Sequence, residues 1–157
     1  MKTSYIKRIV IIVIAVFVAV NVFWFIDVFK PYFSYVQTMK ESEYYRVEDG
    51  DVCYPDGYLC EVAMPTYLYW KDGNLSVASP IEGEYSGHAD LVIWIKHYSG
   101  DVSEVGSFLT YKGESREVYL KDSATAINSD DQPWVDANQE DLEMVFLKAE
   151  DVWGIEL

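Results

Sequence analysis

The run Ile9–Ile26 reads IVIIVIAVFVAVNVFWFI, and Asn21 is its single polar residue. At about 1.5 Å of rise per residue, this run makes roughly 27 Å of α-helix, which nearly matches a bilayer core of about 30 Å. Val28 and Phe29 extend the apolar segment by part of a turn. The sequence therefore predicts a transmembrane helix over residues 9–29, with the lipid bilayer as its partner.

The charges before this run predict its orientation. Lys2, Lys7 and Arg8 precede it, and no acidic residue occurs before Asp27. Because basic residues favour the cytoplasmic side of a membrane, residues 1–8 are expected in the cytoplasm. The expected location is the inner (plasma) membrane of a bacterium, crossed once, with the C-terminal part in the periplasm or another extracytoplasmic space.

The residues that end the apolar run predict that it is not cleaved. Trp24 and the aromatic residues around it are typical of the belt at a membrane surface. Residues 21–33 contain none of the small residues that a signal-peptide cleavage site needs. We therefore expect an uncleaved signal anchor from Ile9 to Ile26 and beyond, in preference to a removed signal peptide or a buried helix of a soluble protein.

The remainder of the chain is strongly acidic. The whole sequence has 26 acidic and 12 basic residues, and residues 1–26 hold three of the bases and none of the acids. The part after residue 26 therefore has nine bases against 26 acids, a net charge of −17. This balance argues against nucleic-acid binding, which requires clustered Lys and Arg.

Two cysteines suggest a covalent link in the extracytoplasmic part. Cys53 and Cys60 enclose Pro55-Asp56-Gly57, a sequence typical of a tight turn. A turn there brings the two cysteines together, and an oxidising compartment then favours a disulfide. Two separate thiols are the first alternative, and a metal site is a weaker one because a CxxC spacing is absent.

The pattern after the anchor predicts an α+β fold that is mainly antiparallel β. Near-helical spacing predicts a juxtamembrane helix or stalk over 30–47, with an extended linker as the alternative. Residues 48–157 are expected to form an acidic, β-rich domain with one meander-like sheet and one disulfide. The expected strands are Glu61–Met64, Thr66–Trp70, Leu75–Ser79, Asp90–Tyr98, Ser107–Tyr111 and Glu117–Lys121.

The C-terminal region allows two interpretations. A short helix is expected around Trp134–Glu140. Residues 142–149 fit a helix because their apolar side chains share one face, but the short run also fits a strand. We favour strands over Met144–Lys148 and Val152–Ile155, separated by a turn.

Motifs for chemistry are scarce. The sequence lacks a P-loop, GxGxxG, HExxH and a GxSxG nucleophile elbow, so we assign no catalytic, cofactor-binding or metal-binding residue. His88 is expected in a loop and His97 at the sheet surface. Asp49 and Asp51 fit a solvated acidic turn better than a calcium loop. An enzyme is not expected, and no cofactor is predicted.

Charge and aromatic content predict a protein-binding function. An acidic surface attracts cationic partners, and aromatic side chains supply binding energy at interfaces. We expect an anchored domain that docks a basic protein partner, of the immunity or inhibitor type. The alternatives are an accessory structural subunit of an envelope or secretion complex, with Asn21 bonded to another helix, and a glycan or cell-wall binder. The candidate partner-binding residues are Trp70, Trp134, Asp130, Asp131, Glu150 and Asp151.

Overall fold

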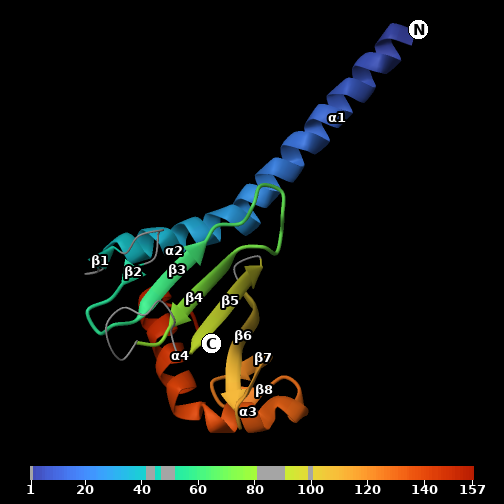
Figure 1. Cartoon of the computed structure of the whole chain (residues 1–157). Coiled ribbons are helices and arrows are strands. Elements are labelled where there is room, and N and C mark those ends of the chain that lie inside the picture. Colours follow the sequence, from blue (N-terminus) through green and yellow to red (C-terminus); the bar gives the residue numbers. More distant parts are fainter. Residues whose placement is uncertain (1, 42–44, 47–51, 81–90, 99–100) are drawn as a thin grey trace.

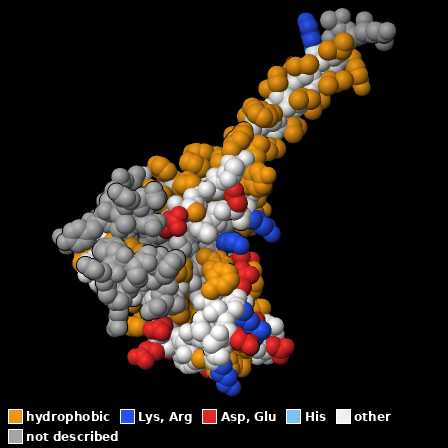
Figure 2. All heavy atoms as spheres, viewed as in Figure 1, with side chains coloured by type: hydrophobic (Ala, Val, Ile, Leu, Met, Phe, Trp, Pro, Cys, Tyr) orange, Lys and Arg blue, Asp and Glu red, His pale blue; other side chains and the backbone are white. Residues whose placement is uncertain are grey.

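A computed structural model describes residues 2–41, 45–46, 52–80, 91–98 and 101–157. The chain begins with one uninterrupted helical rod made of α1 (Lys2–Trp24), the π-helical turn η1 (Phe25–Phe29) and α2 (Lys30–Glu41). In Figure 1 α1 projects away from the domain, whereas α2 lies against it. Figure 2 shows apolar side chains along the projecting part.

The π turn has a packing reason. The side chains of Trp24, Val28 and Tyr32 are all buried against the domain. In a regular α-helix, which has 3.6 residues per turn, residues spaced four apart would move progressively away from one face. The backbone N–H of Lys30 bonds to the carbonyl of Phe25, five residues back, which widens this turn. The wider turn keeps the three side chains on the face that meets the domain.

The sheet has eight strands in the described residues, and it confirms the predicted antiparallel meander. Each strand pairs with the next one along the chain, in the order β1 to β8. The strands are β1 (Tyr45–Arg46), β2 (Val52–Cys53), β3 (Leu59–Ala63), β4 (Asn74–Ala78), β5 (Val92–Tyr98), β6 (Asp101–Tyr111), β7 (Glu114–Asp122) and β8 (Thr125–Ala126). As expected for its apolar sequence, β5 lies inside the sheet, between β4 and β6.

The C-terminal segment is helical, so the strands predicted at Met144–Lys148 and Val152–Ile155 are wrong. After η3 (Ser129–Asp131) and α3 (Gln132–Ala137), the helix α4 runs over Gln139–Trp153. Its apolar side chains repeat with helical period and are buried, and Gly154 ends it in the left-handed conformation (φ 65°). The buried residues of α4 are Leu142, Val145, Phe146, Ala149, Val152 and Trp153.

One face of the sheet carries the core. The inward residues of the strands pack there with α4 and with Tyr32 and Met39 of α2. The predicted helix after the apolar run is present over Lys30–Glu41, but its predicted extent to residue 47 is wrong, because Tyr45–Arg46 form β1 of the sheet. The predicted helix near Trp134 is present as α3. The predicted strand Thr66–Trp70 is wrong: this segment belongs to the loop between β3 and β4.

The predicted disulfide is also wrong. Cys53 and Cys60 are both buried, but no disulfide joins them. In the β2–β3 pair Cys60 lies opposite Val52, and Cys53 lies opposite Leu59. Because neighbouring residues of a strand point to opposite faces, this register places the two side chains on opposite sides of the hairpin. The turn brings the two strands together without forming a Cys53–Cys60 bond.

Candidate functional site

The face of the sheet that points away from α4 carries a group of aromatic side chains. Trp94 of β5 lies opposite Gly106 of β6, and Gly106 lies opposite Tyr119 of β7. Phe108, two residues along β6, is on the same face. We call Trp94, Phe108 and Tyr119 the aromatic face.

Gly106 determines how the indole of Trp94 lies. A Cβ at this position would come within 2.5 Å of the indole ring, so the ring lies across the backbone of the glycine. The ring centroid of Trp94 is 5.4 Å from that of Phe108 and 6.4 Å from that of Tyr119. Phe108 is 62% exposed and Tyr119 37% exposed. The aromatic face therefore forms a broad apolar surface that is open to solvent.

Charged and polar side chains surround the aromatic face. Glu117 accepts a hydrogen bond from the hydroxyl of Tyr119 (3.1 Å), and this bond raises the pKa of Tyr119. Lys96 forms an ion pair with Glu104, and the bond to Glu104 raises the pKa of Lys96. Glu61 accepts from Ser76 at 3.4 Å. Apolar rings inside a polar rim are the usual anatomy of a protein-binding surface.

The described residues give no basis for metal chemistry. Among them, no three His, Cys, Asp or Glu side chains gather as metal ligands. An open hollow of about 350 Å³ lies at the end of β5 and β6, lined by Lys71, Lys96, His97, Tyr98, Ser103 and Glu104. We assign no cofactor to it. Asp49, Asp51 and His88 fall outside the described residues.

His97 is buried, which corrects its predicted place at the sheet surface. Only 4% of this residue is exposed. Its Nδ1 lies 3.2 Å from the hydroxyl of Tyr35, and its ring packs edge-on against Tyr32. A β-bulge next to Lys96 changes the register of β5 and β6 at this point. His97 thus forms part of the joint between the helical rod and the sheet.

Three of the six predicted binding residues come together, and they serve the fold. The Arg116 guanidinium lies 3.6 Å from the centroid of the Trp134 ring. The same side chain pairs with the carboxylate of Asp131 (2.5 Å) and donates to the carbonyl oxygen of Asp130 (2.9 Å). This cluster ties the segment after β8 to β7.

The other three predicted residues lie elsewhere. Glu150 and Asp151 are near the end of α4, and Asp151 is exposed. Trp70 is in the β3–β4 loop, where its ring packs 6.3 Å from that of Phe23 in α1. The six residues therefore do not form one site.

Sequence reasoning missed the aromatic face as a unit. The sequence predicted Trp94 in a strand, but only the register of β5, β6 and β7 brings Phe108 and Tyr119 next to it. The available signal was Gly106 in the middle of an apolar strand. A glycine in a strand often marks a close approach by another group.

Comparisons with protein-family models, with curated proteins and with solved structures found no match to this chain.

Proposed function

We propose that this protein is a single-pass, membrane-anchored binding domain that docks a basic protein outside the cytoplasm. The observation that carries the proposal is the solvent-open aromatic face of Trp94, Phe108 and Tyr119. Large exposed apolar patches with polar rims are typical of protein interaction sites. A sheet face whose only task was structural would be expected to carry polar side chains at such positions.

The helical rod supports membrane anchoring. Its apolar part, Tyr5–Met39, is long and apolar enough to cross a bilayer, and the most apolar window is only 6% buried in the protein. The basic residues before it favour a cytoplasmic N-terminus. In this orientation the domain lies in the periplasm or an equivalent space.

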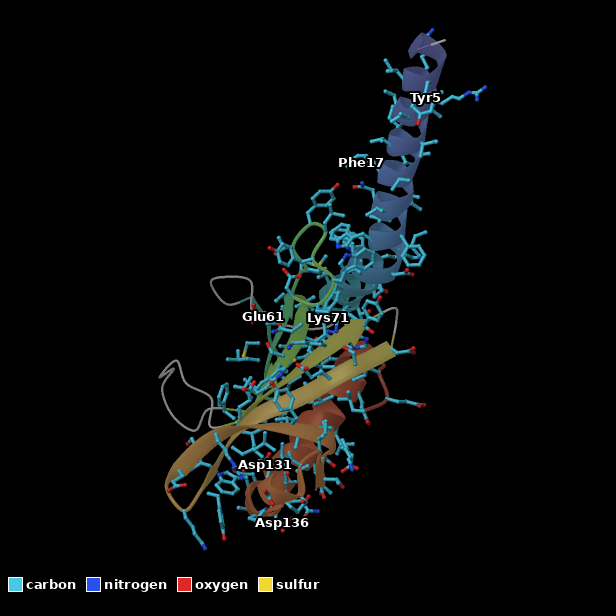
Figure 3. All side chains as sticks on the ribbon, turned by 90° about the vertical axis from the view of Figure 1, so that its right-hand side faces the viewer. Tyr5, Phe17, Glu61, Lys71, Asp131 and Asp136 are labelled. Atoms are coloured by element: carbon cyan, nitrogen blue, oxygen red, sulfur yellow. The ribbon has the colours of Figure 1, made fainter. Side chains whose placement is uncertain are left out.

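Charge supports a basic partner. The part of the chain after residue 26 has a net charge of −17, which attracts cationic proteins and speeds their association. Asp136 is exposed at the end of the domain far from α1 (Figure 3). An immunity or inhibitor protein that masks a cationic toxin or hydrolase fits these requirements.

A glycan or cell-wall ligand is the second candidate, and one observation favours it. Sugars stack on aromatic rings, and the indole of Trp94 lies across Gly106, with Glu61 two strands away on β3 and Glu117 two strands away on β7. By contrast, Asn21 no longer supports an accessory-subunit role. Its amide donates to the carbonyl of Phe17 (2.7 Å), and its oxygen accepts from Tyr67 of the same chain.

The test is capture by the full-length protein in its own membrane, compared with the Trp94→Ala variant. The proposal predicts one basic soluble protein that the wild type retains, that high salt releases, and that the variant retains at least tenfold less. A Leu147→Ala variant is the control, because Leu147 is an exposed residue of α4 (64%). Equal retention by wild type and Trp94→Ala would contradict the proposal. Salt-independent binding of a soluble peptidoglycan fragment would favour the glycan candidate instead.

A further inference from the structure

The loop between β3 and β4, residues 64–73, reaches back along the helical rod (Figure 1). The indole N–H of Trp24 donates to the backbone carbonyl of Tyr69 (3.0 Å). The hydroxyl of Tyr67 donates to the side chain of Asn21, and its ring packs edge-on against Trp24 at 5.3 Å. With the packing of Trp70 on α1, these contacts fix the loop to the end of the apolar run.

The depth of these contacts is the central observation. Asn21 lies five residues before Ile26, the end of the apolar run, which is about 7.5 Å along a helix. A helix that spans the bilayer with this run places Asn21 below the membrane surface. The loop that touches Asn21 must then enter the membrane as well.

The side chains on the loop and on the adjacent helix suit that position. Tyr67 is 55% and Tyr69 65% exposed in the isolated chain. Next to them, Phe25, Phe29 and Phe33 stack on one another along the rod, with ring centroids 5.4 and 6.0 Å apart. Tyrosine prefers the membrane–water interface because its ring is apolar and its hydroxyl is polar. Exposed aromatic residues gathered in this way are unfavourable in water.

Two backbone N–H groups of the loop, those of Thr66 and Tyr69, find acceptors within the loop. The N–H of Tyr69 donates to the carbonyl of Thr66 (2.8 Å), which closes a tight turn. The N–H of Thr66 donates to both carboxylate oxygens of Asp72, each at 3.0 Å. Leu68 adopts φ 61°, a conformation that side-chain-bearing residues avoid. Because lipid-exposed irregular backbone does not occur in the hydrocarbon core, the loop fits the interface, where water and headgroups reach its remaining polar groups.

Basic residues follow the aromatic ones on the domain side of the loop and of the apolar run. Lys71 comes directly after Trp70 and is exposed, and Lys30 begins α2 and is exposed. Figure 3 shows Lys71 on the domain side of the loop, at the opposite end from Phe17 and Tyr5. Lysines at the edge of an apolar segment extend their ammonium groups toward the headgroups.

We propose that the β3–β4 loop is a second membrane contact, which inserts Tyr67 and Tyr69 into the bilayer interface beside the anchor. This inference rests on the proposed membrane anchoring. The lipid bilayer covers the exposed rings of Tyr67 and Tyr69, since these rings continue the lipid-facing side of the helix. The contact fixes the domain at one height and one orientation, instead of leaving it to swing on a stalk.

The test uses the full-length protein in vesicles of phosphatidylcholine and phosphatidylglycerol, with a nitroxide label on Tyr69→Cys. Two reference labels give the accessibilities expected for lipid and for water: Phe17→Cys in the middle of the anchor and Thr110→Cys at an exposed strand position. The unsubstituted chain serves as the labelling blank, because Cys53 and Cys60 are buried. Collisions with oxygen indicate lipid, and collisions with a water-soluble nickel chelate indicate water.

The inference predicts that the label at 69 collides with oxygen in preference to nickel, as the label at 17 does, and that the label at 110 shows the reverse. A nickel-accessible label at 69 beside an oxygen-accessible label at 17 would overturn the loop contact and leave the anchor intact. A nickel-accessible label at 17 would instead overturn the anchoring itself. A label at 69 that is shielded from both reagents means that a protein covers the loop, which also overturns the inference. If Tyr69→Cys does not fold, Tyr67→Cys, at the other ring proposed to insert, gives the same reading.

Discussion

Tyr32 and Gly73 hold the helical rod to the sheet. The hydroxyl of Tyr32 donates to the carbonyl of Gly73 (2.7 Å), and its ring fills the space of a side chain at position 73, where a Cβ would lie 2.8 Å from the ring. The same hydroxyl accepts from the backbone N–H of His97 (3.0 Å). One side chain of α2 therefore connects the end of the β3–β4 loop to the end of β5.

Removal of this hydroxyl is expected to destabilise the protein. Tyr32→Phe removes two buried hydrogen bonds, which costs about 1–3 kcal/mol of the free energy of unfolding. The measurement is denaturant unfolding of the full-length protein in detergent micelles. Tyr119→Phe is the control, because its hydroxyl bonds to Glu117 on an exposed surface, and its expected change is below about 0.5 kcal/mol. Equal effects of the two variants would show that the joint is not a source of stability.

Lys148 is expected to contribute more than a surface lysine. Its ammonium pairs with Asp56 (2.6 Å) and lies 4.2 Å from the ring centroid of Tyr54, with only 10% of the side chain exposed. Lys148→Met is expected to lower the free energy of unfolding by about 1–3 kcal/mol, because a desolvated cation–π contact and an ion pair are lost.

The matched control for this variant is Lys112→Met. Lys112 also lies over a tyrosine ring, that of Tyr111 at 4.7 Å, but on an exposed turn. Its expected change is within about 0.5 kcal/mol. If Lys148→Met lowered the free energy of unfolding as little as Lys112→Met, the contact of Lys148 with the β2–β3 turn would not be a source of stability.

Cys60 makes the stability depend on pH at high pH. Its complete burial raises the pKa of the thiol from 9.0 to about 12. Below pH 9 both the folded and the unfolded chain hold this proton, and above pH 9 only the unfolded chain releases it. The free energy of unfolding is therefore expected to fall from pH 9 to about 12, by up to about 1.4 kcal/mol per pH unit from this group.

The difference between wild type and Cys60→Ala isolates this contribution, because other titrating groups are common to both. Cys60→Ala is expected to be less stable at pH 7, since it leaves a cavity, but to lose less stability from pH 9 upward. Parallel pH profiles of the two proteins would contradict the assignment.

Local sequence patterns predicted much of the fold, and the errors have physical reasons. Alternation in β5 and turn residues between strands were enough to predict the meander. The TYLYW segment alternates in the same way, yet it forms a loop against α1, because its aromatic residues meet the rod instead of a sheet. The segment 139–153 is long enough for its helical periodicity to decide the structure. The prediction of two short strands considered each half of this segment separately and so missed the periodicity.

The remaining errors concern register and distance. A shift of one residue in the β2–β3 pair decides whether Cys53 and Cys60 meet, and turn chemistry does not specify it. The aromatic face depends in the same way on the pairing of three strands around Gly106. The contact of Tyr67 with Asn21 joins residues far apart in the chain, and no local pattern signals it.

The most direct test of the proposed function is photocrosslinking from the aromatic face. A benzoyl-phenylalanine at position 108 replaces an exposed ring by another, and the same residue at position 147 of α4 is the control. In the native membrane we expect an adduct with one basic soluble protein from position 108 and not from position 147. High salt during irradiation and Trp94→Ala should each prevent its formation. An adduct that forms equally from both positions, or that persists with Trp94→Ala, would contradict binding of a basic partner at this face.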